Sequence, residues 1–237
     1  LAGGAPPVGR SARFFGERGT PSGFTARAFT KAMGFTQDDL AKPVIGIAQT
    51  WSEFNNCNAH FKQVAEAVKR GVWQEGGLPL EFPTISLGEV HVQPTTMLFR
   101  NLMAMDTEEM IRAQPMDAVV LLAACDKTTP AALMGAASAD VPAIMVSGGP
   151  MLNGRHDGRE LGACTDCGRA TAELRAGTID AAEYSAIEDA ICRSAGSCMV
   201  MGTASTMASM AEALGMALPG NAAIPAPDSR RLQFAEM

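Results

Sequence analysis

The chain has 237 residues, of which 47% are hydrophobic and 19% are charged, a composition that indicates a globular protein and excludes a disordered one. Its net charge of −6 argues against a nucleic-acid-binding surface, which normally carries a basic excess. No apolar run reaches the roughly 18 residues of a membrane span, and the first residues lack the hydrophobic core of a secretory signal. We therefore expect a cytoplasmic protein with reduced cysteines and with no nucleic-acid or membrane partner.

Four short apolar stretches predict buried parallel strands, over residues 43–50, 81–88, 116–125 and 141–149. Two amphipathic helical patterns alternate with them, over residues 60–77 and 96–113. The second of these helices has a predicted apolar face made of Leu98, Leu102, Met105 and Met110. Because strands and helices alternate, the expected fold class is α/β, with a three-layer, doubly wound and mostly parallel sheet.

The pattern changes after the fourth predicted strand. Residues 150–168 are rich in glycine and charge and predict a long loop. Further helices are expected over residues 168–176, 180–193 and 203–216. The final residues contain several prolines, which predicts a linker or a segment that docks on something else.

Chemically distinctive side chains follow the predicted strands, at the edge where the sites of open α/β sheets form. The first strand is followed by Asn55, Asn56 and Cys57, the second by Glu89, and the third by Cys125, Asp126 and Lys127. Two cysteines, two carboxylates and a lysine are therefore expected to gather at one edge of the sheet.

These side chains fall into two groups of metal ligands, soft thiolates and hard carboxylates. Thiolates suit Fe–S clusters, zinc and copper, whereas carboxylates suit magnesium, calcium or manganese. A third thiolate is available from Cys198, which we expect just before a helix start, where peptide N–H groups favour an anionic sulfur. The alternative interpretation is that the cysteines are small core residues. The acid–lysine pair directly after Cys125 argues against that interpretation for this residue.

Cys164 and Cys167 form a C-x-x-C pattern, which is typical of a zinc half-site or a thioredoxin-like redox pair. The three histidines of the chain supply no H-x-x-x-H as a second pair of zinc ligands. A redox pair should open a helix directly after a strand, whereas this pattern lies in a predicted loop. We give the pair little weight, although a zinc or redox protein centred on it remains an alternative.

Five longer segments occur in a fixed order along the chain: "TWSEFNNCNAHF", "ISLGE", "CDKTTPAALMGAAS", "VSGGPMLNG" and "CMVMGTASTMASMAEALGM". Together they resemble the dihydroxy-acid and sugar-acid dehydratase family, from about residue 12 to residue 231. The resemblance implies an Fe–S cluster on Cys57, Cys125 and Cys198, with [2Fe–2S] favoured over [4Fe–4S].

The resemblance also implies a Mg²⁺ ion beside the cluster, held by Glu89, Asp126 and Lys127. It implies that the lysine is carbamylated and has a catalytic role as well. The modification makes chemical sense, because an ammonium group repels Mg²⁺ whereas a carbamate is an anionic oxygen ligand.

The segments "LGE" and "CDKTTPA" are more similar to the pentonate (arabonate and xylonate) dehydratases than to the branched-chain dihydroxyacid dehydratases. The implied reaction removes water from a 2,3-dihydroxy sugar acid and gives a 2-keto-3-deoxy acid. A branched-chain dihydroxyacid dehydratase remains an alternative.

Family members are more than twice as long as this chain, and the serine that abstracts the substrate proton lies in their C-terminal β-rich domain. The resemblance thus implies that residues 1–225 are an N-terminal cluster-binding domain and that residues 226–237 begin a linker. We expect the chain to be inactive alone and the complete protein to be a homo-oligomer, a dimer or tetramer. A non-catalytic cluster-binding module is the further alternative.

Overall fold

A computed structural model describes residues 9–16 and 18–237 of the chain. Its centre is a parallel sheet of four strands: β1 (Val44–Gln49), β2 (Leu78–Pro83), β3 (Ala118–Ala123) and β4 (Ala143–Ser147). Their order in the sheet is β2-β1-β3-β4. The predicted parallel α/β sheet is therefore confirmed.

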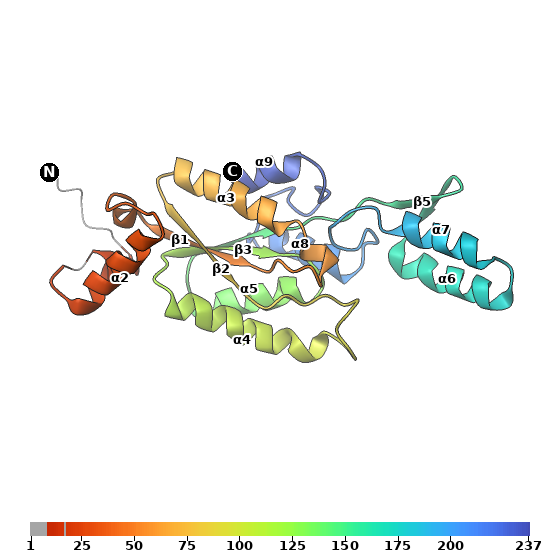
Figure 1. Cartoon of the computed structure of the whole chain (residues 1–237), viewed down its shortest axis with the longest axis horizontal. Coiled ribbons are helices and arrows are strands. Elements are labelled where there is room, and N and C mark those ends of the chain that lie inside the picture. Colours follow the sequence, from red (N-terminus) through yellow and green to blue (C-terminus); the bar gives the residue numbers. More distant parts are fainter. Residues whose placement is uncertain (1–8, 17) are drawn as a thin grey trace.

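Helices cover both faces of this sheet (Figure 1). One face carries α3 (Phe61–Gln74) and the C-terminal helix α9 (Arg230–Glu236), and its core includes Ile47 and Val120 from the strands. The other face carries α4 (Met97–Ala113) and α5 (Thr128–Ala139), with α8 (Thr203–Ala213) packed against α5. Side chains on alternate strand positions enter opposite cores, which produces the predicted three layers.

The outer edge of β4 is partly covered by the residues that follow α8. The Met145 N–H donates to the Met216 carbonyl at 2.7 Å. A single backbone hydrogen bond thus lies where a fifth strand of a doubly wound sheet would pair, before the chain crosses to α9 on the opposite face.

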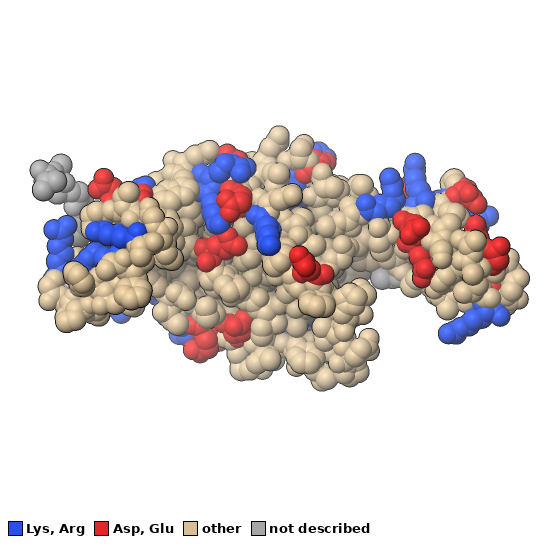
Figure 2. Space-filling model, in the orientation of Figure 1, with Lys and Arg blue, Asp and Glu red and all other residues tan. Residues whose placement is uncertain are grey.

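Of the predicted apolar face of helix α4, only Met110 packs against the core, and the helix otherwise buries a different face. Leu98, Leu102 and Met105 are 66%, 49% and 48% exposed, whereas Met103 and Ile111 are fully buried. The surface over the N-terminal half of α4 carries few charged side chains in the view of Figure 2. The buried face is the one with small residues, because α4 and α5 pack closely at Gly135.

Strand β2 lies three residues earlier than predicted at its N-terminal end and ends five residues earlier. It begins directly after the turn that ends α3, so that Leu78 pairs with Val44. The ladder stops where Pro83 faces Gln49, the last residue of β1. The Thr84 amide still donates to the Gln49 carbonyl at 3.0 Å, and the following residues lead away from β1 to the site.

The region after β4 forms a separate distal lobe, which extends along the long axis of the molecule (Figure 1). It consists of the hairpin β5 (Gly154–His156) and β6 (Arg159–Leu161), followed by α6 (Ala163–Ala176) and α7 (Ala181–Ile191). A small core of Leu161, Ala170 and Ile187 holds it together. The prediction of a long loop over residues 150–168 was therefore wrong.

The C-x-x-C pattern lies in the first turns of α6, directly after β6, and not in a loop as predicted. The side chain of Cys164 lies outside what the structure describes, and Cys167 is exposed. One argument against a redox pair, its predicted position in a loop, therefore does not hold.

Before the sheet, the chain forms α1 (Ala12–Phe15) and α2 (Pro21–Ala32). The Asp117 carboxylate joins this N-terminal region to the sheet, because it accepts hydrogen bonds from the Ser11 amide (3.0 Å) and from the Val44 amide (2.8 Å). Among the described helices, none combines the length and apolar character needed to cross a bilayer.

The last segment of the chain docks on the sheet domain through α9, which packs against α3. Arg231 is fully buried, and its guanidinium donates to the side-chain and backbone oxygens of Asn221, both at 2.7 Å. Burial lowers the pKa of the guanidinium to about 10, so it stays charged at neutral pH. The boundary expected at residue 225 and a linker beyond it stay predictions.

Candidate functional site

The candidate site lies at the carboxyl ends of β1 and β3, which are neighbours in the sheet. The chain leaves β1 toward β2 on one side, and it leaves β3 toward β4 on the other. This is the point where strand order reverses, and ligands of open α/β sheets bind in the crevice that forms there.

A network of asparagines builds the loop after β1. The Asn58 side chain, which is fully buried, donates to the Thr50 carbonyl at 3.0 Å, and the Thr50 hydroxyl donates to the Leu122 carbonyl of β3 at 2.7 Å. The Asn55 side chain accepts a hydrogen bond from the Cys57 amide at 3.2 Å. Cys57 is therefore held on a short 3₁₀ turn (Asn56–Asn58) that is tied to both strands.

The residues after β3 make a sharp turn into α5. Cys125 is buried and has a φ of 76°, in the left-handed region that non-glycine residues rarely adopt. Such a conformation costs on the order of 1–3 kcal/mol, and the surrounding packing must offset that cost. Because of this turn, Cys125, Asp126 and Lys127 lie between the end of β3 and the start of α5, both of which are buried.

The thiols of Cys57 and Cys125 interact directly. Their hydrogen bond, burial and the nearby charges of Cys125 and Cys198 all raise the pKa of Cys57. The same hydrogen bond lowers the pKa of Cys125 against the opposing effect of burial, with help from a hydrogen bond to the backbone of Glu89. Of this pair, Cys125 is thus the sulfur that becomes anionic first, and its thiolate accepts a hydrogen bond from the Cys57 thiol.

Cys198 reaches the same edge from the loop that precedes α8. Ser197 is bridged to the end of β4, because its amide donates to the Gly149 carbonyl at 2.9 Å and its carbonyl accepts from the Met151 amide at 2.8 Å. Helix α8 begins only at Thr203, so the expectation that Cys198 directly precedes a helix start was wrong. The bridge to β4 positions this cysteine instead.

The carboxylates and the lysine form a second cluster. Lys127 Nζ lies 2.8 Å from Glu89 Oε1 and 2.7 Å from Asp126 Oδ2. Burial lowers the pKa of Lys127, but the hydrogen bonds to Asp126 and Glu89 outweigh it, and the pKa is raised. Burial likewise acts to raise the pKa of Glu89, but the bonds from Lys127 and Thr96 lower it below its ordinary value.

The two clusters meet at adjacent residues. Cys125 Sγ lies 3.8 Å from Asp126 Oδ1, and the backbone of Glu89 hydrogen-bonds the same sulfur. The structure thus brings all six of the predicted site residues to one edge: Cys57, Cys125, Cys198, Glu89, Asp126 and Lys127.

The residues present fit the cofactors that the resemblance implies. Cys57, Cys125 and Cys198 are thiols rather than disulfides. Among the described residues, these three do not form a set with all sulfurs within 4.8 Å of one another. Three thiolates are ligands of the soft type that Fe–S clusters take.

The second cluster fits a cation. The Lys127 ammonium group lies between two carboxylates, so its Nζ marks a position where a positive charge is stabilised by both. Carboxylate oxygens are the ligands that Mg²⁺ prefers. A Mg²⁺ ion at this position requires that the ammonium leave or lose its charge.

Sequence reasoning did not find two supporting residues of this site. Thr96 is fully buried, and its hydroxyl hydrogen-bonds Glu89. His60 Nε2 lies 2.8 Å from the Gly148 carbonyl oxygen, which joins the loop after β1 to the end of β4. The closely spaced asparagines near Cys57 were a usable signal for the first loop, because asparagine favours turns and caps. Thr96 carried no such signal.

Comparison with known proteins identifies the family. The family model for the N-terminal region of dihydroxy-acid/6-phosphogluconate dehydratases matches residues 42–237. An L-arabonate dehydratase from Azospirillum brasilense is 56% identical over 229 residues, which are 96% of this chain and 39% of that protein. A D-xylonate dehydratase from Caulobacter vibrioides is 45% identical over 204 residues, 85% of this chain and 34% of that protein.

A dihydroxy-acid dehydratase from Moorella thermoacetica is 42% identical over 215 residues, 89% of this chain and 39% of that protein. The chain thus spans about two fifths of the length of the curated relatives it matches. The matched region contains the whole sheet and both clusters of the candidate site. The chain therefore belongs to the dihydroxy-acid/6-phosphogluconate dehydratase family, whose N-terminal region it matches.

Proposed function

We propose that this chain is the cofactor-binding part of a dehydratase that converts a 2,3-dihydroxy sugar acid into a 2-keto-3-deoxy acid. The observation that carries the proposal is the meeting of a thiol cluster and a carboxylate–lysine cluster at Cys125 and Asp126. Two chemically different sets of ligands that meet at one backbone turn suit a substrate with two neighbouring hydroxyl groups.

In this proposal Cys57, Cys125 and Cys198 hold an Fe–S cluster, with [2Fe–2S] favoured, and Glu89, Asp126 and Lys127 hold Mg²⁺. When bound, the two cofactors supply Lewis acids, because three protein thiolates leave one iron with an open coordination position. The left-handed turn at Cys125 fixes the distance between the two sets of ligands, since adjacent residues belong to each.

Lys127 has to change its charge to serve as a ligand. Its ammonium group first gives up one proton to become a neutral amine. The amine nitrogen then forms a bond to the carbon of CO₂ and loses a second proton to solvent, which yields an anionic carbamate. The hydrogen bonds that raise the pKa of Lys127 favour the ammonium form until a cation competes for Glu89 and Asp126. Thr96 meanwhile keeps the Glu89 carboxylate oriented.

Pentonates are the proposed substrates, because relatives named for L-arabonate and D-xylonate align with most of this chain. A branched-chain dihydroxyacid is the alternative, since a relative named dihydroxy-acid dehydratase also aligns. The relatives are much longer than this chain, and we propose that turnover requires residues beyond the region aligned here. Assembly of the complete protein into a homo-oligomer stays a prediction.

Anaerobic purification of the chain tests the cofactor part of the proposal. Iron and acid-labile sulfide should be present, and Cys57→Ser, Cys125→Ser and Cys198→Ser should each lose most of both. Cys192→Ser is the matched control, because the Cys192 thiol is close enough to Cys198 to be affected by its charge but is assigned no iron. Iron retained in all three site variants would contradict the proposal.

The substrate part needs the complete protein under anaerobic conditions. Pentonates, hexonates and branched-chain 2,3-dihydroxyacids should be compared for 2-keto acid formation, with and without Mg²⁺. We expect pentonates to be preferred and activity to require Mg²⁺. Preference for the branched-chain acid would support the alternative, and no dehydration of any of them would refute the proposed reaction.

A further inference from the structure

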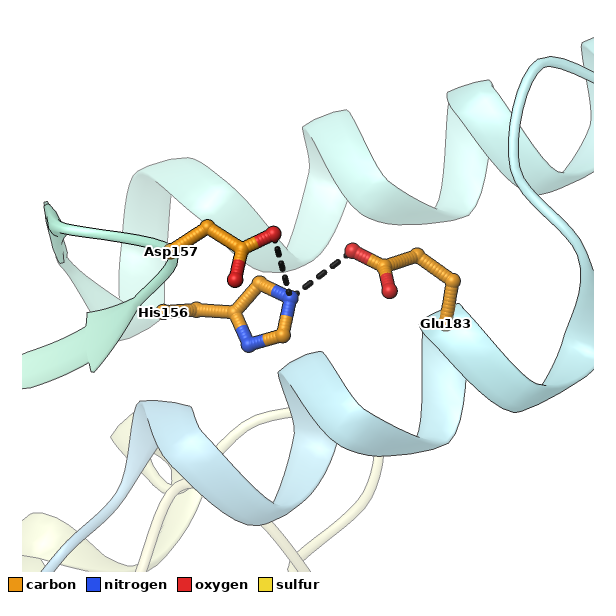
Figure 3. A group of neighbouring side chains, drawn as sticks. All are labelled: His156, Asp157 and Glu183. Atoms are coloured by element: carbon orange, nitrogen blue, oxygen red, sulfur yellow. Dashed lines mark hydrogen bonds and ion pairs between the residues drawn. The ribbon is translucent and has the colours of Figure 1, made fainter.

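A histidine and two carboxylates meet in the distal lobe, apart from the candidate site. His156 ends β5, Asp157 follows it in the turn to β6, and Glu183 lies in the first turn of α7. One ligand atom of each lies within 4.8 Å of the other two. Figure 3 shows both carboxylates directed at the same nitrogen of the imidazole ring.

His156 and Glu183 are paired with each other, and Asp157 approaches the same nitrogen from the solvent side. His156 Nε2 lies 2.7 Å from Glu183 Oε1 and 3.7 Å from Asp157 Oδ2. The His156 side chain is 20% exposed, whereas that of Asp157 is 84% exposed. The cluster is thus buried on the His156 side and open to solvent on the Asp157 side, where an ion can enter.

The backbone fixes the positions of the two inner donors. Helix α7 begins with Asp180 as its N-cap, whose side chain accepts a hydrogen bond from the Glu183 amide at 2.8 Å. His156 pairs with Arg159 across the hairpin, and Asp157 turns the chain with a φ of 45°. The three donors therefore come from two elements of the lobe, the hairpin and α7, and converge in the structure, so that an ion could bind all three after a small separation of the His156 and Glu183 ligand atoms.

The charge of the cluster suits a divalent cation, since two carboxylates balance two positive charges. Figure 2 shows side chains of both signs on this lobe. Arg169, which lines the adjacent cavity of about 370 Å³, is already paired with Asp166 at 2.9 Å and with Glu173 at 3.3 Å. Arg159 also lines the cavity and is a further positive charge on its wall.

We propose that His156, Asp157 and Glu183 bind a divalent transition-metal ion such as Zn²⁺, with water in the remaining coordination positions. Imidazole nitrogen together with carboxylate oxygen is a donor set that Zn²⁺ accepts readily, whereas Mg²⁺ and Ca²⁺ prefer oxygen ligands alone. The bound ion joins the β5–β6 hairpin to α7 and so stabilises the lobe. None of the six residues of the candidate site takes part.

The histidine side chains themselves provide the test, since the chain contains only His60, His91 and His156. Zn²⁺ is added to the full chain, and the imidazole nitrogen resonances are followed by long-range ¹H–¹⁵N NMR. The resonances of His156 should shift and saturate with one equivalent at this site, while those of His91 stay in place. Zn²⁺ taken up by cysteine thiols elsewhere does not register at His156.

Two variants and a control complete the experiment. Glu183→Gln and Asp157→Asn should each weaken the Zn²⁺-dependent shift of His156 by at least about 10-fold in affinity. Glu160→Gln, on the same hairpin but paired with Arg155, should leave it unchanged. Asp157 is in an exposed turn, so its variant remains folded even if the helix variant does not. Unshifted His156 resonances in the parent chain, or parental affinity in Asp157→Asn, would overturn the proposal.

Discussion

Gly135→Ala should destabilise the protein, although alanine is the better helix former. Gly135 lies within α5, where a Cβ would be 2.6 Å from the Ala104 carbonyl oxygen of α4. It would also be 2.7 Å from the Thr107 Cβ and 3.0 Å from the Glu108 amide nitrogen. These atoms belong to the backbone of α4 or lie next to it, so they cannot rotate away. The two helices would have to separate.

The magnitude follows from two opposing contributions. Alanine stabilises a helix interior relative to glycine by about 1 kcal/mol. Forcing an extra carbon into a packed contact costs about 1–3 kcal/mol, and contacts this short to backbone atoms belong in the upper half of that range. We expect a net loss of about 1–2 kcal/mol in the free energy of unfolding.

Urea unfolding followed by far-UV circular dichroism measures this loss. Gly168→Ala is the matched control, because Gly168 also lies inside a helix, α6. Among the described residues, and apart from its chain neighbours and its own helix backbone, no atom lies within 4 Å of the added carbon. This control should be stabilised by about 0.5–1 kcal/mol. If Gly135→Ala gains stability as Gly168→Ala does, the close contact between α4 and α5 is not as described.

Arg231→Met removes the donor of two buried oxygens of Asn221, and the free energy of urea unfolding should fall by about 2–4 kcal/mol; unchanged stability would refute this. Thr96→Val should weaken Mg²⁺ binding, measured by calorimetry, on the order of 10–100-fold, because Glu89 loses an orienting hydrogen bond; equal affinity would exclude that role. The pKa of Glu89 is held below its ordinary 4.5, so its contribution to stability is present above that pH and is lost in acid. Lys127→Met removes this partner of Glu89, so the melting temperature of the variant should fall less steeply than that of the parent as the pH is lowered through 4.5. An equally steep fall would contradict the ion pair.

Part of the site could be predicted because it depends on strand ends. Cys57 follows β1, and Cys125 and Asp126 follow β3, and the carboxyl ends of parallel strands share one edge whatever the details of packing. Glu89 was assigned to the same edge although β2 ends at Pro83, since the loop after this strand still leads there. An error of several residues in a strand therefore left the predicted site intact.

Other features depend on contacts between distant segments. The apolar pattern of α4 is compatible with burial of either of two faces. The buried face is the one whose residues, Ala104 and Thr107, contact Gly135 of α5 closely. Thr96 and Glu89 are brought together by a loop that has no periodic pattern to read. The position of Cys198 is set by a bridge between Ser197 and the end of β4, which no local signal announces.

The sequence by itself determined the parallel α/β architecture and which residues after β1 and β3 lie at the carboxyl edge of the sheet, because periodicity and strand ends are local properties. Only the tertiary structure decided that the Lys127 ammonium lies between Glu89 and Asp126, 2.8 Å and 2.7 Å from their oxygens. It also decided that His156, Asp157 and Glu183 converge in a separate lobe. The physical reason is the same in both cases: such pairings depend on the packing of a loop or turn against another element, and sequence spacing does not encode that distance.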